Sequence, residues 1–480
     1  MGGSGPHAQL KKYKSNISAQ CNRLTHKRQS RLLSSFRGVV YYTLWRLFGC
    51  AGAVNSATAQ RVIQRAITSE SQYKMNVTFE DIQAAAGLIK DRVLRTPCFP
   101  AARLSELTGA NVVLKLENLQ HTGAFKVRGA LVKLLSLTQD ERKAGVIAAS
   151  AGNHAQGVGY FARQLGIPAT IVMPKNTPFT KIARTEALDA QVVLHGEGFI
   201  QARDHAFFLA EQEGYNFVHP YDDEKVIAGQ GTIGLEMVED QPQLDSIIAS
   251  IGGGGLISGV AIAAKHLNPD IEIYGVQAET FPSMYDAYHK CTTDALYGQT
   301  IADGIAVKTP SPNTQAIIES MIEDIFLVSE IEIEKSLQAY LELKRIVVEG
   351  AGAAPLAALL RNKEHFKGRS VGLVVSGGNI DPRMLSTILM RGLAREGRLV
   401  SLRIKIMDMP GVLSKVSQII GDTGANIIEV HHQRLFSDVP LKQTEMDVAV
   451  ETLDQKHVQN LVSVLCKAGF ETRVLSGTSE

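Results

Sequence analysis

Short apolar runs alternate with amphipathic stretches from about Thr78 onward. Thr78 can cap a helix with Asp81 as its acidic partner three residues later, and apolar residues then recur at helical spacing. The pattern that follows predicts strands at 111–116, 145–149, 169–173, 191–194, 246–251, 272–277 and 370–375, and helices at 124–135, 154–165 and 180–188. Apolar strands between helices are typical of parallel sheets covered on both faces, which predicts an α/β fold.

A different order of elements follows a linker at residues 392–398. Strand and helix periods then alternate as β-α-β-β-α-β, which is a ferredoxin-like order. The strands are expected at 401–407, 426–433, 444–451 and 471–475, and the helices at 412–423 and 456–468. The chain is therefore predicted to carry a second, smaller domain at its C-terminal end.

Composition narrows the class of protein. With 480 residues, 45% hydrophobic and 20% charged, the chain is expected to be globular, with about three units. A formal net charge of +2 gives no reason to expect a nucleic-acid partner. The sequence contains no run of about 18 apolar residues, so no membrane span is predicted. Five scattered cysteines without a CxxC pair fit a reducing compartment better than a disulfide framework or a zinc site.

Residues 1–74 differ from the rest of the chain. They contain one acid, Glu70, against twelve Lys and Arg. A basic, acid-poor segment is typical of an organelle transit peptide or a disordered arm, and a start at Met75 would also account for it. We expect a leader that is not a folded domain. The predicted location is the cytoplasm, or an organelle matrix if the leader is a transit peptide.

Two glycine-rich segments are candidates for phosphate binding. Four consecutive glycines stand between a buried strand and a helix: Gly252, Gly253, Gly254 and Gly255. Their backbone can wrap around an anion beside the positive end of the helix, which favours a phosphate site over a flexible turn. The run 229–234 has the letters of a dinucleotide fingerprint, but no buried strand precedes it. We interpret those glycines as helix packing.

Lys126 is the candidate nucleophile. It lies in a segment with Phe125 and Val127 beside it and glycines on either side. A lysine in such surroundings can lose solvent, which lowers the pKa of its amine and lets it attack an aldehyde. A solvated surface lysine is the ordinary alternative, and the local sequence leaves both open.

Two polar segments follow predicted strands. One opens a helix and could hold a carboxylate on its N–H groups: Ser150, Ala151, Gly152, Asn153 and His154. An ordinary helix cap is the alternative, and His154 beside a cap is more often structural. The other begins with Ser376 at the end of the 370–375 strand, where sites form in α/β sheets; a turn is its alternative.

Together these segments resemble the fold-type II pyridoxal-phosphate enzymes, specifically threonine ammonia-lyases (threonine dehydratases). The resemblance covers about residues 78–393 and rests on the Lys126 segment, Ser150–His154, Gly252–Gly255 and Ser376-Gly-Gly-Asn. It implies two α/β subdomains, as in the β subunit of tryptophan synthase, with pyridoxal 5'-phosphate between them. The catalytic domain would span residues 75–395, with a small subdomain at about 145–222.

The resemblance also implies roles for these residues. Lys126 would form an imine with the cofactor and later take the α-proton of the substrate. Asn153 would contact the phenolic oxygen of the ring, Gly252–Gly255 would hold the phosphate, and Ser376 would face the pyridine nitrogen. Ser150–His154 would bind the substrate carboxylate. An imine withdraws electrons from Cα, and a serine at the ring nitrogen favours prompt loss of the β-hydroxyl over transamination.

Four further positions modify this reading. Ala151 stands where the similar serine racemases need a hydroxyl as a second acid/base, so racemisation is disfavoured. Ala124 replaces a serine common in relatives, a change we expect to be tolerated. Glu279 resembles an acidic position used for a cation, but the other ligands do not match and we expect no metal. Glu349 corresponds to a glutamate near the ring, although a solvated loop carboxylate is an equal alternative.

The C-terminal domain, residues 400–476, resembles an ACT domain. In this class the turn after the first strand and a residue of the next strand often hold an amino-acid effector at a domain interface. The corresponding residues are Asp408, Pro410, Gly411, Val412, Leu413 and Asn426. A purely structural dimer module is the alternative. The resemblance implies a role in isoleucine biosynthesis. One such unit fits, however, where biosynthetic relatives have a doubled region, and this difference argues against the usual isoleucine feedback.

The resulting hypothesis is an allosteric lyase that converts L-threonine to 2-oxobutanoate and ammonia, with L-serine as a secondary substrate. We expect a homo-oligomer, a dimer or tetramer, that binds small amino acids and neither nucleic acid nor membrane. The alternatives are a serine dehydratase or serine racemase, and a non-catalytic amino-acid sensor. Lys126, Asn153 and Ser376 together argue against the sensor.

Overall fold

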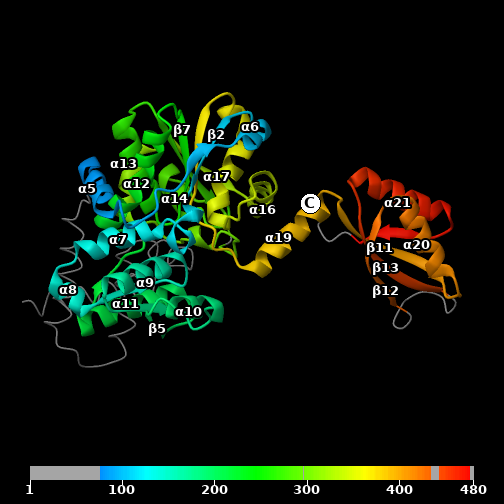
Figure 1. Cartoon of the computed structure of the whole chain (residues 1–480), viewed down its shortest axis with the longest axis horizontal. Coiled ribbons are helices and arrows are strands. Elements are labelled where there is room, and N and C mark those ends of the chain that lie inside the picture. Colours follow the sequence, from blue (N-terminus) through cyan, green and yellow to red (C-terminus); the bar gives the residue numbers. More distant parts are fainter. Residues whose placement is uncertain (1–75, 296, 434–442, 476–480) are drawn as a thin grey trace, which may run out of the picture. The chain divides into compact units, whose positions relative to one another are not determined.

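The computed structural model describes residues 76–295, 297–433 and 443–475. The predicted leader, residues 1–74, lies outside the described residues, as do Met75 and the last residue of the predicted C-terminal domain, 476. Three β-sheets and their covering helices make up the described part of the chain (Figure 1). Among the described residues, no helix is both long enough and apolar enough to cross a membrane.

The largest sheet has six strands in the order β1-β2-β10-β7-β8-β9. β1 runs antiparallel to β2, and all other pairs are parallel. The strands are Cys98–Pro100 (β1), Asn111–Leu116 (β2), Ser246–Ser250 (β7), Glu272–Ala278 (β8), Asp324–Val328 (β9) and Ser370–Val375 (β10). Four of them agree with the predicted strands to within one residue. β1 and β9 were not predicted, because both are short edge strands with few fully buried residues.

Alternate residues of the large sheet enter two separate cores. On β7, Ile247 packs with helices on one face, and Ile248 packs with helices on the other. Figure 1 shows the two pairs of helices on opposite sides of the sheet. The first pair is α12 (Glu224–Asp240) and α13 (Gly255–Leu267), and the second is α16 (Glu330–Ala339) and α17 (Gly350–Arg361). Both faces are covered, as the apolar strands predicted.

Among the described residues, six further helices accompany the six-stranded sheet. They are α5 (Phe79–Ile89), α6 (Ala102–Thr108), α14 (Ser283–His289), α15 (Pro312–Met321), α18 (Lys363–Phe366) and α19 (Pro382–Arg395). The predicted cap of α5 is confirmed, because the Thr78 hydroxyl accepts from the Asp81 N–H while the Asp81 carboxylate accepts from the Thr78 N–H.

The second sheet is parallel throughout, in the order β5-β4-β3-β6. Its strands are Val146–Ala149 (β3), Ala169–Met173 (β4), Gln191–Leu194 (β5) and Asn216–Phe217 (β6). Val146 and Ala148 join a core with α7 and α9, whereas Ile147 and Ala149 pack against α11. The helices are α7 (Lys126–Ser136), α8 (Gln139–Ala144), α9 (Asn153–Leu165), α10 (Phe179–Glu186) and α11 (Phe199–Glu213).

The helix predicted at 124–135 begins later than expected. α7 starts at Lys126, because Ala124 pairs in an isolated β-bridge with Gly377 and is therefore extended. The long-range pairing that holds this residue has no local signal in the sequence.

The glycines of 229–234 are packing residues of α12, which confirms the interpretation made from their context. A Cβ on Gly229 would lie 2.6 Å from the Cα of Gly129 in α7, and one on Gly234 would lie 2.7 Å from the carbonyl oxygen of Val260 in α13. α12 can approach both helices closely only because these positions lack a side chain.

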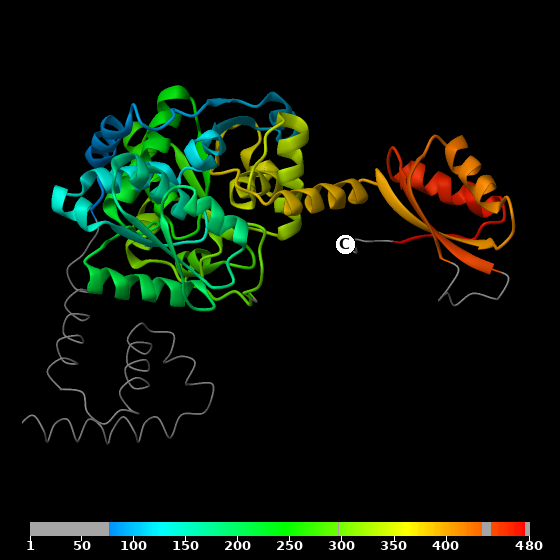
Figure 2. The same cartoon turned by 60° about the horizontal axis from the view of Figure 1, so that its bottom comes forward.

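The C-terminal part is a four-stranded antiparallel sheet in the order β12-β13-β11-β14, with two helices on one face (Figure 2). Its elements are β11 (Leu399–Met407), α20 (Val412–Asp422), β12 (Asn426–Gln433), β13 (Gln443–Glu451), α21 (Gln455–Lys467) and β14 (Thr472–Val474). The apolar core includes Leu402 and Ile404 of β11 and Val448 of β13. The order and topology are those of the predicted ferredoxin-like fold.

A buried cluster of four charged side chains joins β2, α7 and α12. The Arg128 guanidinium, which is fully buried, donates to both oxygens of Glu117 at 2.8 and 2.9 Å and to those of Glu236 at 2.7 and 2.9 Å. The ammonium of Lys115, also fully buried, donates to Glu236 at 2.5 Å. Two positive and two negative charges balance, and buried charges are tolerated when they are paired and hydrogen-bonded in this way.

We predict that Arg128→Met lowers the free energy of unfolding by about 3–5 kcal/mol, because it leaves two buried carboxylates with one remaining cation. Urea denaturation followed by circular dichroism measures the change. The matched control is Arg163→Met, which removes a pair with Asp189 whose side chains are 55% and 70% exposed. That variant should lose less than about 1 kcal/mol. Equal losses in the two variants would contradict a structural role for the buried cluster.

Candidate active site

The predicted site residues lie at the carboxyl ends of strands from both parallel sheets. Lys126 opens α7 after β2, Ser376 follows β10, and the glycine loop follows β7. Ser150 follows β3 of the small sheet, and Asn153 is the first residue of α9. Carboxyl ends of parallel strands share one edge of a sheet, where α/β proteins place their sites. Hydrogen bonds between these loops show which of them the fold brings together.

The loop before Lys126 pairs with the loop after β10. The N–H of Phe125 donates to the Ser376 carbonyl at 3.0 Å, and the N–H of Gly378 donates to the Gly123 carbonyl at 2.9 Å. Ala124, which replaces the serine of many relatives, is fully buried at the bridge with Gly377. This pairing places Lys126 at the start of α7, directly beside the Ser376 segment.

Lys126 is half-buried, and its amine donates to the Pro220 carbonyl at 2.7 Å. Desolvation lowers the pKa of this lysine to about 8, although the negative charge of Glu349 opposes the shift. Near physiological pH, a much larger fraction of this amine is neutral than of an ordinary lysine, and the neutral form is the nucleophile. The surface-charge alternative for Lys126 therefore does not fit its surroundings.

Tyr221 connects Lys126 to the glycine loop. It follows the Pro220 carbonyl that accepts from the lysine, and its ring lies against Gly253, where an added Cβ would meet ring carbons at 2.3 Å. The hydroxyl of Thr314 in α15 donates to the Gly253 carbonyl at 2.7 Å. α13 begins at Gly255, and the N–H groups of a first helical turn have no partner within the helix. The loop can therefore offer N–H donors to an anion.

Asn153 reaches from the small sheet to residues of the large one. Its Nδ2 donates to both carboxylate oxygens of Glu349, at 2.8 and 3.1 Å, and its Oδ1 accepts from Asn379 at 2.8 Å. Glu349 is 7% exposed, and desolvation raises its pKa to about 7. Glu349 is therefore a buried group within the cluster, and the alternative of a solvated loop carboxylate is wrong.

The other residues of the 150–154 segment lie around the start of α9. The Ser150 hydroxyl accepts from the Gly152 N–H at 3.2 Å, and Ala151 packs against the apolar core of the small sheet. His154 is buried and donates through Nε2 to the Val218 carbonyl at 2.8 Å, and desolvation lowers its pKa to about 3. A histidine held neutral in this way has a structural role.

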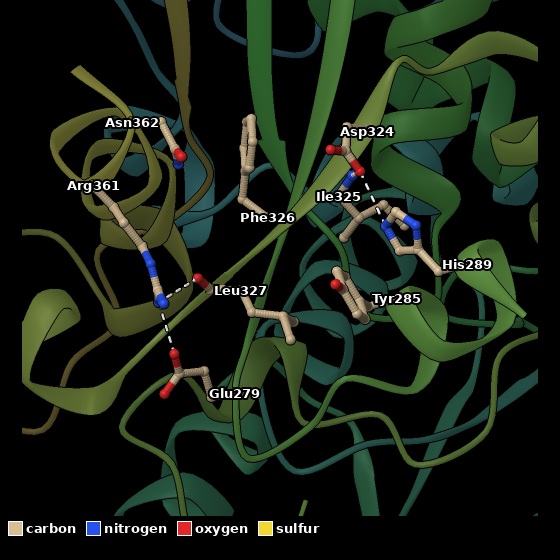
Figure 3. A pocket seen from close by; sticks show the side chains of 9 residues that line it. All are labelled: Glu279, Tyr285, His289, Asp324, Ile325, Phe326, Leu327, Arg361 and Asn362. Atoms are coloured by element: carbon tan, nitrogen blue, oxygen red, sulfur yellow. Dashed lines mark hydrogen bonds and ion pairs between the residues drawn. The ribbon is translucent and has the colours of Figure 1, made fainter. Parts of the chain in front are cut away.

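Glu279 follows β8, away from these contacts. Its carboxylate pairs with Arg361 at 2.7 Å, and the same guanidinium nitrogen donates to the Leu327 carbonyl (Figure 3). The two residues line an open pocket of about 300 Å³ beside β9. Within the described residues, no group of three or more His, Cys, Asp or Glu side chains is arranged to hold a metal ion.

Within one chain, the predicted effector residues lie in two separate places, the turn at 408–413 and the start of β12. The turn at residues 408–413 follows the carboxyl end of β11, and Gly411 there has φ +85°, a conformation that favours glycine. Asn426 starts β12 and pairs with Glu451, the residue that also pairs with Leu399 at the opposite end of β11. One copy of the sheet therefore does not bring Asn426 to the turn.

The sequence did not point to several residues that complete the cluster. Pro220 and Tyr221 follow a two-residue strand, too short to be predicted, and Asn379 received no role beyond its place in a motif. The useful signal was position, because each of these residues lies in the loop that follows a parallel strand, three or four residues after its end.

The residues suit a phosphorylated aldehyde cofactor. A desolvated amine can attack the aldehyde, the start of α13 and its glycine loop can hold a phosphate, and Ser376 and Asn153 can contact a ring. Ser376 is 2% exposed and lies in the loop that pairs with the Lys126 segment. The arrangement therefore fits pyridoxal phosphate on chemistry that the structure itself displays.

Comparison with known proteins gives the same result. A family model described as pyridoxal-phosphate dependent enzyme matches residues 89–377. An L-threonine ammonia-lyase of Thermotoga maritima is 45% identical over 400 residues, which cover 83% of this chain and 100% of that protein.

Two solved structures resemble the catalytic part. The processed form of threonine deaminase isoform 2 from Solanum lycopersicum has a TM-score of 0.62 at 34% identity, covering 65% of this chain and 86% of its own. Serine racemase from Dictyostelium discoideum has a TM-score of 0.60 at 34% identity, covering 64% and 99%. The family model matches more than half of the chain, and the Thermotoga relative is covered completely. The chain therefore belongs to the family of pyridoxal-phosphate dependent enzymes.

Proposed function

We propose that the protein is a threonine ammonia-lyase that converts L-threonine to 2-oxobutanoate and ammonia, with L-serine as a secondary substrate. The observation that carries the proposal is the half-buried Lys126, with its pKa lowered to about 8, among loops that suit pyridoxal phosphate. The 45% identity to an L-threonine ammonia-lyase over 400 residues supports the choice of substrate. When bound, the cofactor withdraws electrons from the substrate Cα and so makes its proton removable.

In this proposal, each site residue has a role towards the cofactor or the substrate. Lys126 holds the cofactor and accepts the α-proton, and the N–H groups at Gly252–Gly255 hold the phosphate. Ser376 faces the pyridine nitrogen, and Asn153 presents its amide to the phenolic oxygen of the ring. The N–H groups of the segment from Ser150 to His154 bind the substrate carboxylate. Elimination without racemisation follows because Ala151, which has no hydroxyl, cannot return a proton to the opposite face of Cα.

Lys126→Ala should lower the rate of 2-oxobutanoate formation from L-threonine by at least about a thousandfold, since both cofactor attachment and proton transfer are lost. The control is Lys143→Ala, which removes a lysine whose side chain is 78% exposed. The same assays measure pyruvate formed from L-serine and, by chiral chromatography, D-serine. A wild-type protein that forms D-serine faster than 2-oxo acid would be a racemase, and the proposal would fail.

The rate at which pyridoxal phosphate combines with the apoenzyme should rise with pH and reach half its maximum near pH 8. The neutral amine reacts, and the lowered pKa of Lys126 makes this form available below the ordinary lysine range. Glu349 favours the charged amine, so Glu349→Gln should move the midpoint to lower pH. Stopped-flow absorbance measures the profile, with Glu364→Gln, an exposed carboxylate, as the control. A midpoint near pH 10 in the wild type would rule out a desolvated Lys126.

We further propose that the protein is a homo-oligomer and that its ACT domain binds an amino-acid effector between two copies. The N–H groups at the start of α20 suit the effector carboxylate, and Asn426 suits its polar groups. The turn at 408–413 lies at the end of β11 opposite to Asn426, so the two can form one site only if they come from different copies.

Subunit complementation tests this arrangement. Calorimetry with isoleucine and with valine should find binding to the wild type, and no binding to Gly411→Asp or to Asn426→Ala alone. Co-expression of the two variants should restore one intact site in each mixed pair, which is half of the wild-type stoichiometry. If a single variant keeps full binding, or if the mixed pair recovers none, the two-copy site is wrong.

A further inference from the structure

Asn379 connects the turn before Lys126 to Asn153. Its Nδ2 donates to the Thr122 carbonyl at 2.6 Å and to the Asn153 Oδ1 at 2.8 Å. Thr122 has φ +58°, an uncommon conformation for a residue with a β-branched side chain. The neighbouring Gly123 leaves space for the Asn379 amide, because an added Cβ there would lie 2.9 Å from the Asn379 Oδ1. The backbone of this turn is therefore shaped around the Asn379 side chain.

The Thr122 carbonyl, which can only accept, fixes which atom donates in each of these hydrogen bonds. The Thr122 carbonyl only accepts, so the Asn379 atom beside it must be Nδ2. The Asn153 atom that the same nitrogen contacts must then be Oδ1, which turns the Asn153 Nδ2 towards Glu349. The orientation of the Asn379 amide therefore fixes the orientation of the Asn153 amide, and both follow from the Thr122 main-chain carbonyl.

Glu349 alone could not maintain this order. As a carboxylate it accepts from the Asn153 amide, but as a carboxylic acid it carries a donor and can bind an amide carbonyl instead. Desolvation raises the pKa of Glu349 to about 7, with Asp303 raising it further and Lys181 opposing. Lys126 is the other charged group coupled to it. Glu349 therefore changes state near neutral pH, whereas the Asn379 amide does not titrate.

We propose that Asn379 is a positioning residue that holds the Asn153 amide with its N–H, and not its carbonyl, directed into the active site. The inference rests on the proposed contact between Asn153 and the cofactor ring. Without the Asn379 donor, the Asn153 amide is free to turn over and to present an acceptor to the phenolic oxygen of pyridoxal phosphate. Asn379 thereby keeps one orientation of Asn153 in both protonation states of Glu349.

The test compares Asn379→Ala with Asn379→Asp, Asn153→Ala and the double variant Asn153→Ala/Asn379→Ala. The readouts are the pH titration of the absorption of bound pyridoxal phosphate, and kcat and KM for L-threonine. Asn379→Ala should shift the spectral titration in the same direction as Asn153→Ala and lower kcat about tenfold, which is the scale of one lost hydrogen bond, with little change in KM. The loss should be larger below pH 7, where protonated Glu349 competes for the Asn153 carbonyl.

The double variant should show no further spectral shift than Asn153→Ala alone, because Asn379 acts through Asn153. Asn379→Asp preserves the size of the side chain without the amide donor, so it should behave like Asn379→Ala. The matched control is Asn118→Ala, which removes an amide that donates to the Val347 carbonyl at 3.1 Å and not to Asn153. It should leave the spectrum unchanged.

Three outcomes overturn the inference: wild-type spectra in Asn379→Asp, additive shifts in the double variant, or equal shifts in Asn118→Ala. An unchanged spectrum in Asn153→Ala has a different meaning, since it would remove the proposed role of Asn153 itself. The inference about Asn379 and the function on which it rests can therefore fail separately.

Discussion

The buried guanidinium of Arg128 ties together the elements on which the candidate site depends. It lies two residues after Lys126 and bonds to Glu117, directly after β2, and to Glu236 in α12. Each of its partners is itself held, since Lys115 donates to Glu236 and Thr96 to Glu117. A charge buried in this way requires every partner to stay in place, because any missing bond exposes the full cost of desolvation. The first turn of α7, and Lys126 with it, is positioned as a consequence.

The second constraint is the connection between the two parallel sheets. Asn153 starts a helix of the small sheet, but its side-chain partners Glu349 and Asn379 belong to the large one. The site is therefore completed by a few polar contacts across a boundary and not by a continuous element. Polar contacts of this kind suit a site that must admit a substrate, because they can be replaced by others at small net cost.

Desolvation shifts the pKa of three titratable groups around the start of α7 and α9. It lowers the pKa of Lys126 to about 8 and that of His154 to about 3, and it raises the pKa of Glu349 to about 7. Burial disfavours the charged form in each case, so it lowers the pKa of the two bases and raises that of the acid. At His154 the hydrogen bond to the Val218 carbonyl opposes the shift but desolvation outweighs it. At Lys126 the negative charge of Glu349 opposes the shift. Two groups that titrate near neutral pH are thus placed together, an arrangement common at catalytic sites.

The sequence alone predicted the fold class, the order of most strands, the ferredoxin-like C-terminal part and the candidate site segments around Lys126, Asn153, Gly252–Gly255 and Ser376. It could do so because buried parallel strands are continuous apolar runs, and because site residues follow such strands directly. The fold-type II resemblance then supplied roles that the local pattern had left open. These features are local, since neighbours along the chain carry the whole signal.

Features that depend on residues far apart in the chain are visible only in the folded protein. Glu349 is buried and accepts from Asn153, which in turn accepts from Asn379. Ala124, predicted to be helical, instead pairs with Gly377 in a β-bridge. The separation of Asn426 from the turn at 408–413 also follows from strand register, which no single segment encodes. The pKa of Lys126 also depends on residues that are far apart in the chain. The lysine and its apolar neighbours can be read along the chain, but the desolvation that lowers its pKa is produced by segments that meet only on folding.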